Sequence, residues 1–232
     1  SQNRIVRKIT AKEGVRARDI GDLLVKNGKF DKAEVAAALK DAEALGLPAA
    51  AKGKPEGFLF PATYDFEPDT TAVDALRTMV AQNRAVLEEL GVPARKQREV
   101  IIKASIVQAE GGSEEDFGKI ARVIENRLDD GMRLQMDSTV AYGAGHSKVF
   151  TTAAERADKS NRYNTYAHFG LPVGPIGNPG KAAIEAVLDP PKGSWRYFVV
   201  VNLDTGETKF AADGAGHEAN RRELLDWMEK NR

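Results

Sequence analysis

Two β-prone stretches that bracket two helical stretches decide the fold of the N-terminal part of this chain. The first is Arg4-Ile5-Val6-Arg7-Lys8-Ile9-Thr10, whose side chains alternate with the period of a strand. The second is Gly57-Phe58-Leu59-Phe60-Pro61-Ala62-Thr63-Tyr64-Asp65-Phe66, in which the proline confines a strand to a sheet edge or a bulge. Between them, residues 16–27 and 32–45 carry apolar side chains at helical spacing, and Asp31 is a predicted N-cap. We therefore expect a small βααβ domain over residues 1–67.

A long helix follows this unit. Thr70 or Thr71 is the predicted N-cap, the apolar spacing continues to Leu90, and Gly91-Val92-Pro93 ends the helix. We interpret residues 68–92 as a helix that links two domains.

The remaining residues, 93–232, are expected to form a mixed α+β domain. Helices are predicted at 95–110, 114–129, 181–188 and 218–230, and a hairpin at 196–210 turns at Asp204-Thr205-Gly206. A loop-rich region at 131–180 separates the first two helices from the rest. Loops of this length inside a compact domain are mostly functional or disordered, and its aromatic and turn residues favour a functional one.

Composition narrows the function classes. The 232 residues include 34 basic and 34 acidic side chains, and this balance argues against a nucleic-acid binder and leaves room for an uncharged substrate such as a sugar polymer. There is no cysteine, which excludes disulfides, thiol catalysis and cysteine-based zinc sites. His146, His168 and His217 lack metal-ligand spacing, so no metal site is predicted.

The chain has no apolar run of about 20 residues, the length that a membrane span needs. It begins Ser1-Gln2-Asn3 without an initiator methionine, and we expect an upstream portion that this sequence does not include.

Glu110 is the first candidate for chemistry. It ends the helix that carries Ile106 and is followed by Gly111-Gly112. The negative end of the helix dipole and the apolar neighbours both favour a protonated carboxyl, which is the state that a general acid needs. By position alone, an ordinary solvated glutamate before a glycine stop is favoured over a general acid.

Two polar clusters accompany it. Residues 126–143 crowd Arg, Gln, Asp, Ser, Thr and Tyr around glycines, which suits sugar hydroxyls and ring faces, but a helix N-cap at Asp137 or Ser138 with a solvated loop is an equal reading. Residues 163–180 join Tyr163-Asn164-Thr165-Tyr166 to a rigid loop rich in glycine and proline, which either lines a binding site or forms a structural crossover. For His217 and Asn220 a surface or capping role is favoured over a cleft.

Together these segments resemble the MltG/YceG-like family. The matching stretches are 55–64, 104–110, 126–128, 131–143, 163–166, 170–172 and 178–180, followed by Tyr197-Phe198-Val199 and residues 217–220. Their order and spacing cover nearly the whole chain from about residue 4.

The resemblance implies an endolytic murein transglycosylase that cleaves nascent peptidoglycan strands, leaves 1,6-anhydro-N-acetylmuramic acid ends and terminates strand elongation. It implies a LysM-like domain, an extracytoplasmic catalytic domain, one N-terminal span in the inner (plasma) membrane, and cell-wall synthases as partners. It implies Glu110 as the catalytic residue, with no metal or cofactor. The substrate-binding residues that we expect are Gln135, Asp137, Ser138, Thr139, Tyr142, Tyr163 and Asn164.

The chain departs from the family at one position. The family motif often carries two acids, and here Gln108 replaces the first while Glu110 holds the second. The competing interpretations are a non-catalytic peptidoglycan-binding module and a hydrolase that leaves reducing ends.

Overall fold

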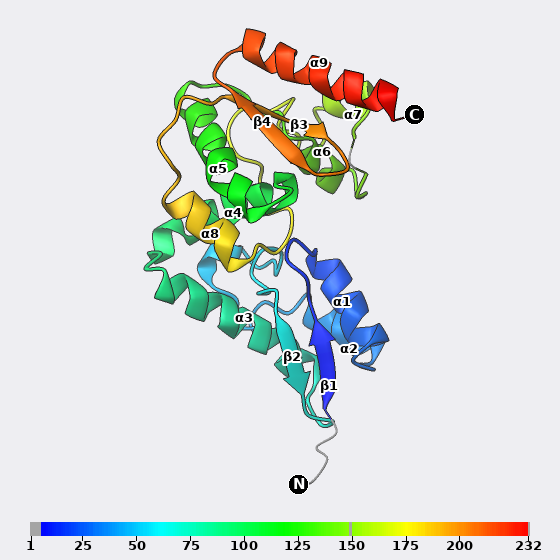
Figure 1. The fold of residues 1–232 in the computed structure, drawn as a ribbon. Helices are drawn as coiled ribbons and strands as arrows, with labels where there is room; N and C mark the ends of the chain where they lie inside the picture. The colour runs from blue at the N-terminus through cyan, green and yellow to red at the C-terminus, as the bar shows by residue number, and fades with distance from the viewer. Residues whose placement is uncertain (1–5, 149, 232) are drawn as a thin grey trace. The chain divides into compact units, whose positions relative to one another are not determined.

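The structure is a computed structural model that describes residues 6–148 and 150–231. It is a mixed α+β chain, as expected, and it divides into two compact units. Their elements are labelled in Figure 1. Unit 1 comprises Ser1–Ser105 and Gly174–Lys181, and unit 2 comprises Ile106–Val173 and Ala182–Arg232. No helix in the described part is long and apolar enough to cross a membrane.

The two predicted strands pair in unit 1. Strand β1 (Arg7–Thr10) runs antiparallel to β2 (Thr63–Phe66), with Ile9 opposite Tyr64. Arg4 and Ile5, where the first strand was expected to begin, lie outside the described residues. Strand β2 begins only after Pro61, which has no N–H to give to a ladder.

Helices α1 (Ala17–Lys26) and α2 (Lys32–Ala38) lie between these strands in sequence. The predicted cap is confirmed, because Asp31 accepts hydrogen bonds from the N–H groups of Ala33 and Glu34 at 2.8 and 3.0 Å. Helix α2 ends seven residues before the expected residue 45. The Asp41 carboxylate accepts from Ala44 N–H at 2.9 Å, and this local bond offers the backbone a turn in place of helix. The short 3₁₀ turn η1 (Ala49–Ala51) follows.

The expected linking helix is α3 (Ala72–Glu89), capped by Thr71 as predicted. Its Leu76 and Met79 are fully buried in the same core as Ile9 and Leu24. Helix α3 is therefore a core element of unit 1. The division between the units falls in α4 (Ala94–Glu110), after Ser105, and differs from the domain boundary expected at residue 92.

The end of the long loop returns to unit 1. Residues 174–180 are all buried there. The Asn178 side chain accepts from Leu59 N–H at 3.0 Å and donates to the carbonyl of Val15 at 2.8 Å. Of the two readings of this glycine- and proline-rich segment, the structural crossover is the one that its burial supports.

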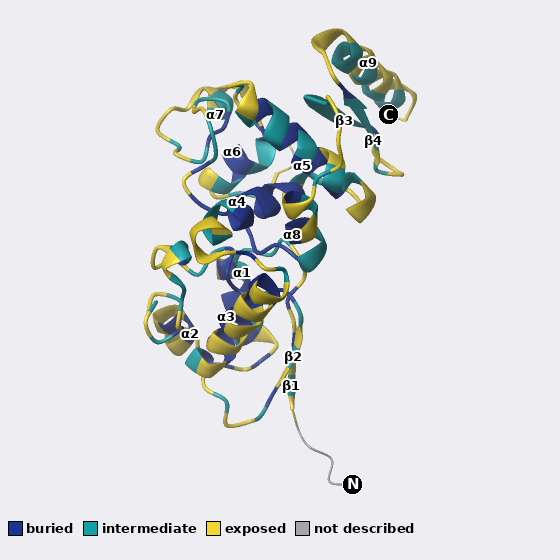
Figure 2. Ribbon diagram, turned by 90° about the vertical axis from the view of Figure 1, so that its left-hand side faces the viewer, coloured by how far each residue is buried: buried dark blue, intermediate teal, exposed yellow. Residues whose placement is uncertain are grey.

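In its described part, unit 2 contains the C-terminal part of α4, further helices, of which α8 begins at the last residue of unit 1, and a hairpin. The helices are α5 (Glu114–Asp129), α6 (Asp137–Gly143), α7 (Ala153–Ala157), α8 (Lys181–Leu188) and α9 (Gly214–Lys230). Strand β3 (Tyr197–Asn202) pairs antiparallel with β4 (Glu207–Ala211), with a bulge between Val200 and Asn202. Helix α9 packs on β3, and no residue of α9 is fully buried (Figure 2).

Polar side chains of α5 hold the segment that leads into β3. Arg122 donates to the carbonyls of Pro190 and Pro191, and Asn126 donates to those of Gly193 and Trp195. Arg127 Nε donates to the carbonyl of Arg196 at 2.6 Å. These bonds give donors to carbonyls of the segment that leads into β3, and they fix the position of β3 beside α5.

Candidate active site

Glu110 is the last residue of α4, half-buried where the helix ends. Gly111 follows it with no room for a side chain, because a Cβ there would lie 2.4 Å from the ring of Phe117. The glycine lets α5 pack directly against the end of α4. The helix end and this close packing together place the carboxyl in a partly desolvated position.

Ser138, in the first turn of α6, contacts Glu110. Its Oγ donates to Glu110 Oε1 at 2.6 Å, and its backbone N–H reaches the same oxygen at 3.3 Å. Both donors favour the ionised carboxylate. Helix α6 therefore supplies a pair of donors to the acid that ends α4.

Burial raises the pKa of the Glu110 carboxyl above its usual value, and the negative charge of Asp137 acts in the same direction. The hydrogen bonds from Ser138 oppose this rise but do not reverse it. A carboxyl tuned in this way is able to hold a proton nearer to neutral pH and to give it up to a basic oxygen.

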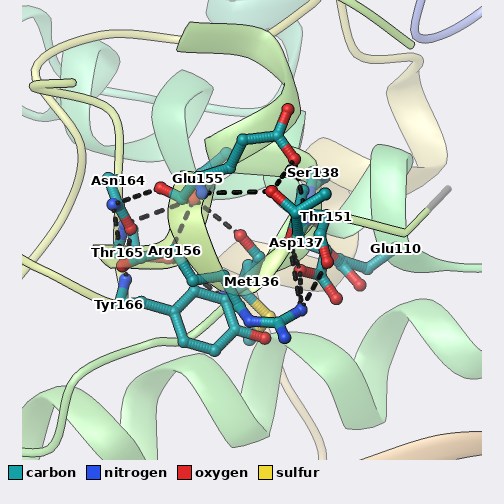
Figure 3. Close-up of polar contacts among 12 residues, drawn as sticks. Glu110, Met136, Asp137, Ser138, Thr151, Glu155, Arg156, Asn164, Thr165 and Tyr166 are labelled. Atoms are coloured by element: carbon teal, nitrogen blue, oxygen red, sulfur yellow. Dashed lines mark hydrogen bonds and ion pairs between the residues drawn. The ribbon is translucent and has the colours of Figure 1, made fainter. Parts of the chain in front are cut away.

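Asp137 directly precedes Ser138, the residue that donates to Glu110, and its carboxylate has its own partners (Figure 3). Its carboxylate accepts a hydrogen bond from Thr151 and lies 3.7 Å from Nη1 of Arg156. The Arg156 guanidinium also lies over the ring of Tyr166, 5.6 Å from the ring centre. Burial and then the charge of Asp137 raise the pKa of Tyr166 to about 12, so its hydroxyl keeps its proton.

Glu110, Asp137 and Tyr166 line a pocket of about 390 Å³ in unit 2. Three predicted site residues contribute to it: Glu110, Gln135 and Asp137. Gln135 is exposed and adopts a left-handed backbone conformation with φ of 55°, which is strained for a residue other than glycine. Its Oε1 lies 3.4 Å from Nη1 of Arg127. Together with Ser138, these residues form the cluster that the sequence predicted around the acid.

Two other residues that were predicted to bind substrate are buried, and their side chains bond to backbone carbonyls. Asn164 is fully buried, and its Nδ2 donates to the carbonyls of Glu155, Arg156 and Asp158. Thr139 is fully buried too, and its hydroxyl donates to the Met136 carbonyl at 2.7 Å. Neither side chain is exposed in this structure, so their contact with a glycan stays a prediction that the burial does not support.

Tyr142 and Tyr163 pair with each other, with ring centres 4.7 Å apart. Both are half-buried, and neither belongs to the residues that line the pocket. The structure therefore brings them together but does not bring them to Glu110.

The pocket has further lining residues that the sequence reasoning did not select. They are Arg127, Leu134, Met136, Tyr166, Tyr197, Phe198, His217 and Arg221. His217 stacks on Tyr197 with ring centres 5.0 Å apart, so it lines a cleft and does not have the surface or capping role that was favoured. Arg127, Tyr197 and His217 lie in segments that resemble a known family, and this resemblance is the signal by which the sequence could have identified them.

Among the described residues, no group of three or more His, Cys, Asp or Glu side chains is placed to hold a metal ion. The chemistry that the geometry supports directly is proton transfer by Glu110, with Ser138, Gln135 and Tyr166 as neutral hydrogen-bonding groups nearby.

Comparisons with known proteins identify a family that this chain resembles. The model of the YceG-like family matches residues 1–223. A protein of Bacillus subtilis (strain 168) named endolytic murein transglycosylase is 32% identical over 222 residues, which cover 88% of this chain and 61% of the relative. A protein of Streptococcus pneumoniae serotype 2 with the same name is 31% identical over 173 residues, covering 71% of this chain and 31% of that relative.

A solved structure shows the same fold. The crystal structure of a YceG-like protein from Listeria monocytogenes superposes with a TM-score of 0.78 at 31% identity, and the match covers 92% of this chain and 75% of that chain. This chain thus spans about 61% and 31% of the lengths of the two curated relatives.

Proposed function

Since the chain belongs to the YceG-like family, we propose that it is an endolytic murein transglycosylase with Glu110 as both its acid and its base. The observation that carries the proposal is one half-buried carboxyl with a raised pKa, which lines a pocket and is held by two donors of Ser138. The two curated relatives carry the name of this activity.

The proposed reaction needs one carboxyl. Protonated Glu110 gives its proton to the glycosidic oxygen between N-acetylmuramic acid and N-acetylglucosamine, and the C1–O bond breaks. The carboxylate so formed then removes the proton of the C6 hydroxyl of the same muramyl residue, while O6 bonds to C1. The product is a 1,6-anhydro end and Glu110 is protonated again. Hydrolases generally need a second carboxylate to deliver water or to attack C1, whereas here the sugar supplies the attacking oxygen.

Ser138 fits the second half of this cycle. Its two donors stabilise the carboxylate that forms when the leaving group takes the proton. Without them, burial and the Asp137 charge together would hold the proton on Glu110 more tightly than the transfer requires. The exposed Gln135 and the protonated Tyr166 hydroxyl are the groups that we assign to sugar hydroxyls, in place of Thr139 and Asn164.

Gln108 bears on the choice of catalytic residue. It lies two positions before Glu110 on α4, and residues two apart on a helix point in different directions. Glu110 lines the pocket and Gln108 is not among its lining residues. This geometry supports Glu110 as the family acid in this chain, so the replacement at 108 does not remove the chemistry.

The finer features implied by the family are part of the same proposal. We assign the βααβ elements of unit 1 to a LysM-like module that binds glycan, and we expect the catalytic part to face the cell wall outside the cytoplasm. A single membrane span upstream of this sequence and cell-wall synthases as partners complete the proposal, and nucleic acid has no part in it.

Product analysis tests the proposal. Purified sacculi are digested with the wild-type chain and with Glu110→Gln, and the soluble fragments are weighed by mass spectrometry. We expect anhydro-ended fragments from the wild type and none from the variant. Reducing ends, which are heavier by one water, would identify a hydrolase. Retention on sacculi without any soluble product would identify a binding module.

A further inference from the structure

Three basic residues of the pocket have no part in the proposed proton transfer, and they come from two elements. Arg127 belongs to α5, His217 to the first turn of α9, and Arg221 to the next turn of α9. We propose that Arg127 and His217, together with the exposed Arg221, form a subsite for a carboxylate group of the substrate. This inference rests on the proposed function, because it adds a charged group to the glycan that Glu110 cleaves.

Arg127 is a buried cation that lacks a charged partner. It is only 6% exposed. Its Nε and Nη1 donate to the carbonyls of Arg196 and Leu134 at 2.6 and 2.8 Å, with further Nη1 contacts to Arg133 and Gln135. Among the described residues, no carboxylate forms an ion pair with Arg127. Within the same residues, no group accepts a hydrogen bond from its Nη2. An unpaired buried charge is costly, so an anionic ligand in the pocket supplies what the protein does not.

His217 is the second donor, and its packing fixes which nitrogen carries the proton. Its Nδ1 is buried without a hydrogen-bond partner among the described residues. A buried N–H with no acceptor is more costly than a bare lone pair, so the neutral ring with its proton on Nε2 is favoured. Burial, with the positive charges of Arg221 and Arg127, lowers the pKa of His217 and keeps the ring neutral. His217 therefore presents an Nε2–H and no accessible acceptor.

Tyr197 connects these groups. Its ring stacks on His217 with centres 5.0 Å apart, and the Arg127 guanidinium lies 5.0 Å from the centre of the same ring. This packing holds both donors at one part of the pocket. A set of nitrogen donors without acceptors matches a group that only accepts hydrogen bonds, and an ionised carboxylate is such a group.

Murein strands differ from neutral amino-sugar polymers in carrying carboxylates on the muramyl residues. In a strand without peptides, the carboxylate is that of the lactyl side group. In a strand with peptides, the carboxylates belong to the peptide. The proposed subsite recognises the carboxylate that both kinds of strand carry, and it would select muramyl glycans over neutral ones.

The first test compares ligands on one protein. Glu110→Gln prevents turnover, and its affinity is measured for peptide-free strands before and after their carboxylates are converted to amides. We expect the charged strands to bind about tenfold more tightly, the effect of one hydrogen bond to a charged group. Equal affinities for the two forms overturn the inference. Peptide-bearing strands, charged and amidated, show which source of carboxylate gives the larger preference.

The second test removes single donors, in the same Glu110→Gln background. His217→Phe keeps a ring to stack on Tyr197 but has no donor, whereas His217→Gln restores an amide donor at the reach of Nε2. The preference for charged strands should fall with Phe and return with Gln. Arg221→Ala should lower it by about threefold. Arg222→Ala is the matched control, because Arg222 is exposed on the same helix and does not line the pocket.

Thermal unfolding of each variant verifies that it is folded, and the ligand comparison on Glu110→Gln does not depend on any change at Arg127. A preference that survives in His217→Phe refutes the role of His217. The two proposals fail separately. If sacculi release anhydro ends but strands with and without carboxylates bind equally, only the subsite is wrong. If charged strands are preferred but no anhydro ends appear, only the proposed reaction is wrong.

Discussion

Replacing Ser138 by alanine tests how the protein tunes its acid. The hydroxyl gives Glu110 Oε1 its shortest hydrogen bond, 2.6 Å, while the backbone N–H at 3.3 Å stays in the variant. A hydrogen bond to a charged group contributes about 1.5–3 kcal/mol, and about 1.4 kcal/mol corresponds to one pH unit of titration. Since the remaining N–H and water partly replace the hydroxyl, we take the lower end of this range. The protonated form of Glu110 then persists to a pH about one unit higher in Ser138→Ala.

The proposed reaction starts from protonated Glu110, so the rate falls as the pH rises through the pKa of this group. Ser138→Ala should therefore move the high-pH limb of kcat/KM upward by about one pH unit. The assay is the initial rate of release of anhydro-ended fragments from sacculi over roughly pH 5–9.

Ser160→Ala is the control for this experiment. Ser160 donates to the carboxylate of Asp158 at the same distance, 2.6 Å, but both residues are exposed and neither lines the pocket. Its pH profile should match the wild type. A limb that stays in place or moves to lower pH in Ser138→Ala would refute the assignment of Ser138 as the donor that tunes Glu110.

Three further predictions concern stability. Burial raises the pKa of Glu110 in the folded state, so between the usual pKa of 4.5 and the raised one the native chain binds more protons than the unfolded chain, and its stability declines as the pH rises. The Tm of Glu110→Gln should therefore exceed that of the wild type by a margin that grows from acidic to neutral pH. A constant margin contradicts this prediction. Asn164→Ala leaves three partly buried carbonyls without their donor and should lower the free energy of unfolding by about 2–3 kcal/mol in urea titration, a loss that a surface role would not produce. Gln135→Gly relieves the strain of a left-handed backbone and should stabilise the fold by about 1 kcal/mol, measured by calorimetric melting. The same change should weaken glycan binding in a strand-binding titration. Lower stability of the variant argues against strain at this position.

The sequence predicted those parts of the fold that local chemistry decides. Asp31 and Thr71 cap their helices because a short side chain with an oxygen acceptor reaches a free N–H of the first turn, whatever the rest of the protein does. Helices α5 and α8 have the predicted bounds, 114–129 and 181–188. Helix α9 begins at Gly214, four residues earlier than expected, since two glycines in its first turn look like a turn in sequence.

Of the two helices inside the long loop, α7 was missed, and α6 was expected only as one of two interpretations of the segment around Asp137 and Ser138. Helix α7 opens with a capping box, in which Thr152 and Glu155 each bond the other's backbone N–H, and this local signal was present in the sequence. Helix α6 follows Met136, whose side chain makes no capping hydrogen bond, so nothing marks its first residue except the acid at Asp137.

The site was predictable only in part. Glu110, Asp137 and Ser138 lie in motifs that a family resemblance marks, and the structure brings them together. Asn164 is as polar as any sugar-binding residue, and only its complete burial shows that it serves the backbone of the loop. The contact of His217 with Tyr197 joins a helix to a strand by tertiary packing, which no periodicity in either segment encodes.

The return of residues 174–180 to unit 1 has a consequence for how the chain is made. Asn178 bonds to partners 119 and 163 positions earlier, so a ribosome must finish most of the protein before unit 1 can close. Until then, Leu59 N–H and the Val15 carbonyl lack these partners. A nascent chain that pauses before residue 174 is therefore open to proteolysis and to capture by chaperones, and truncation at the apparent end of the first βααβ elements would reproduce that unfinished state.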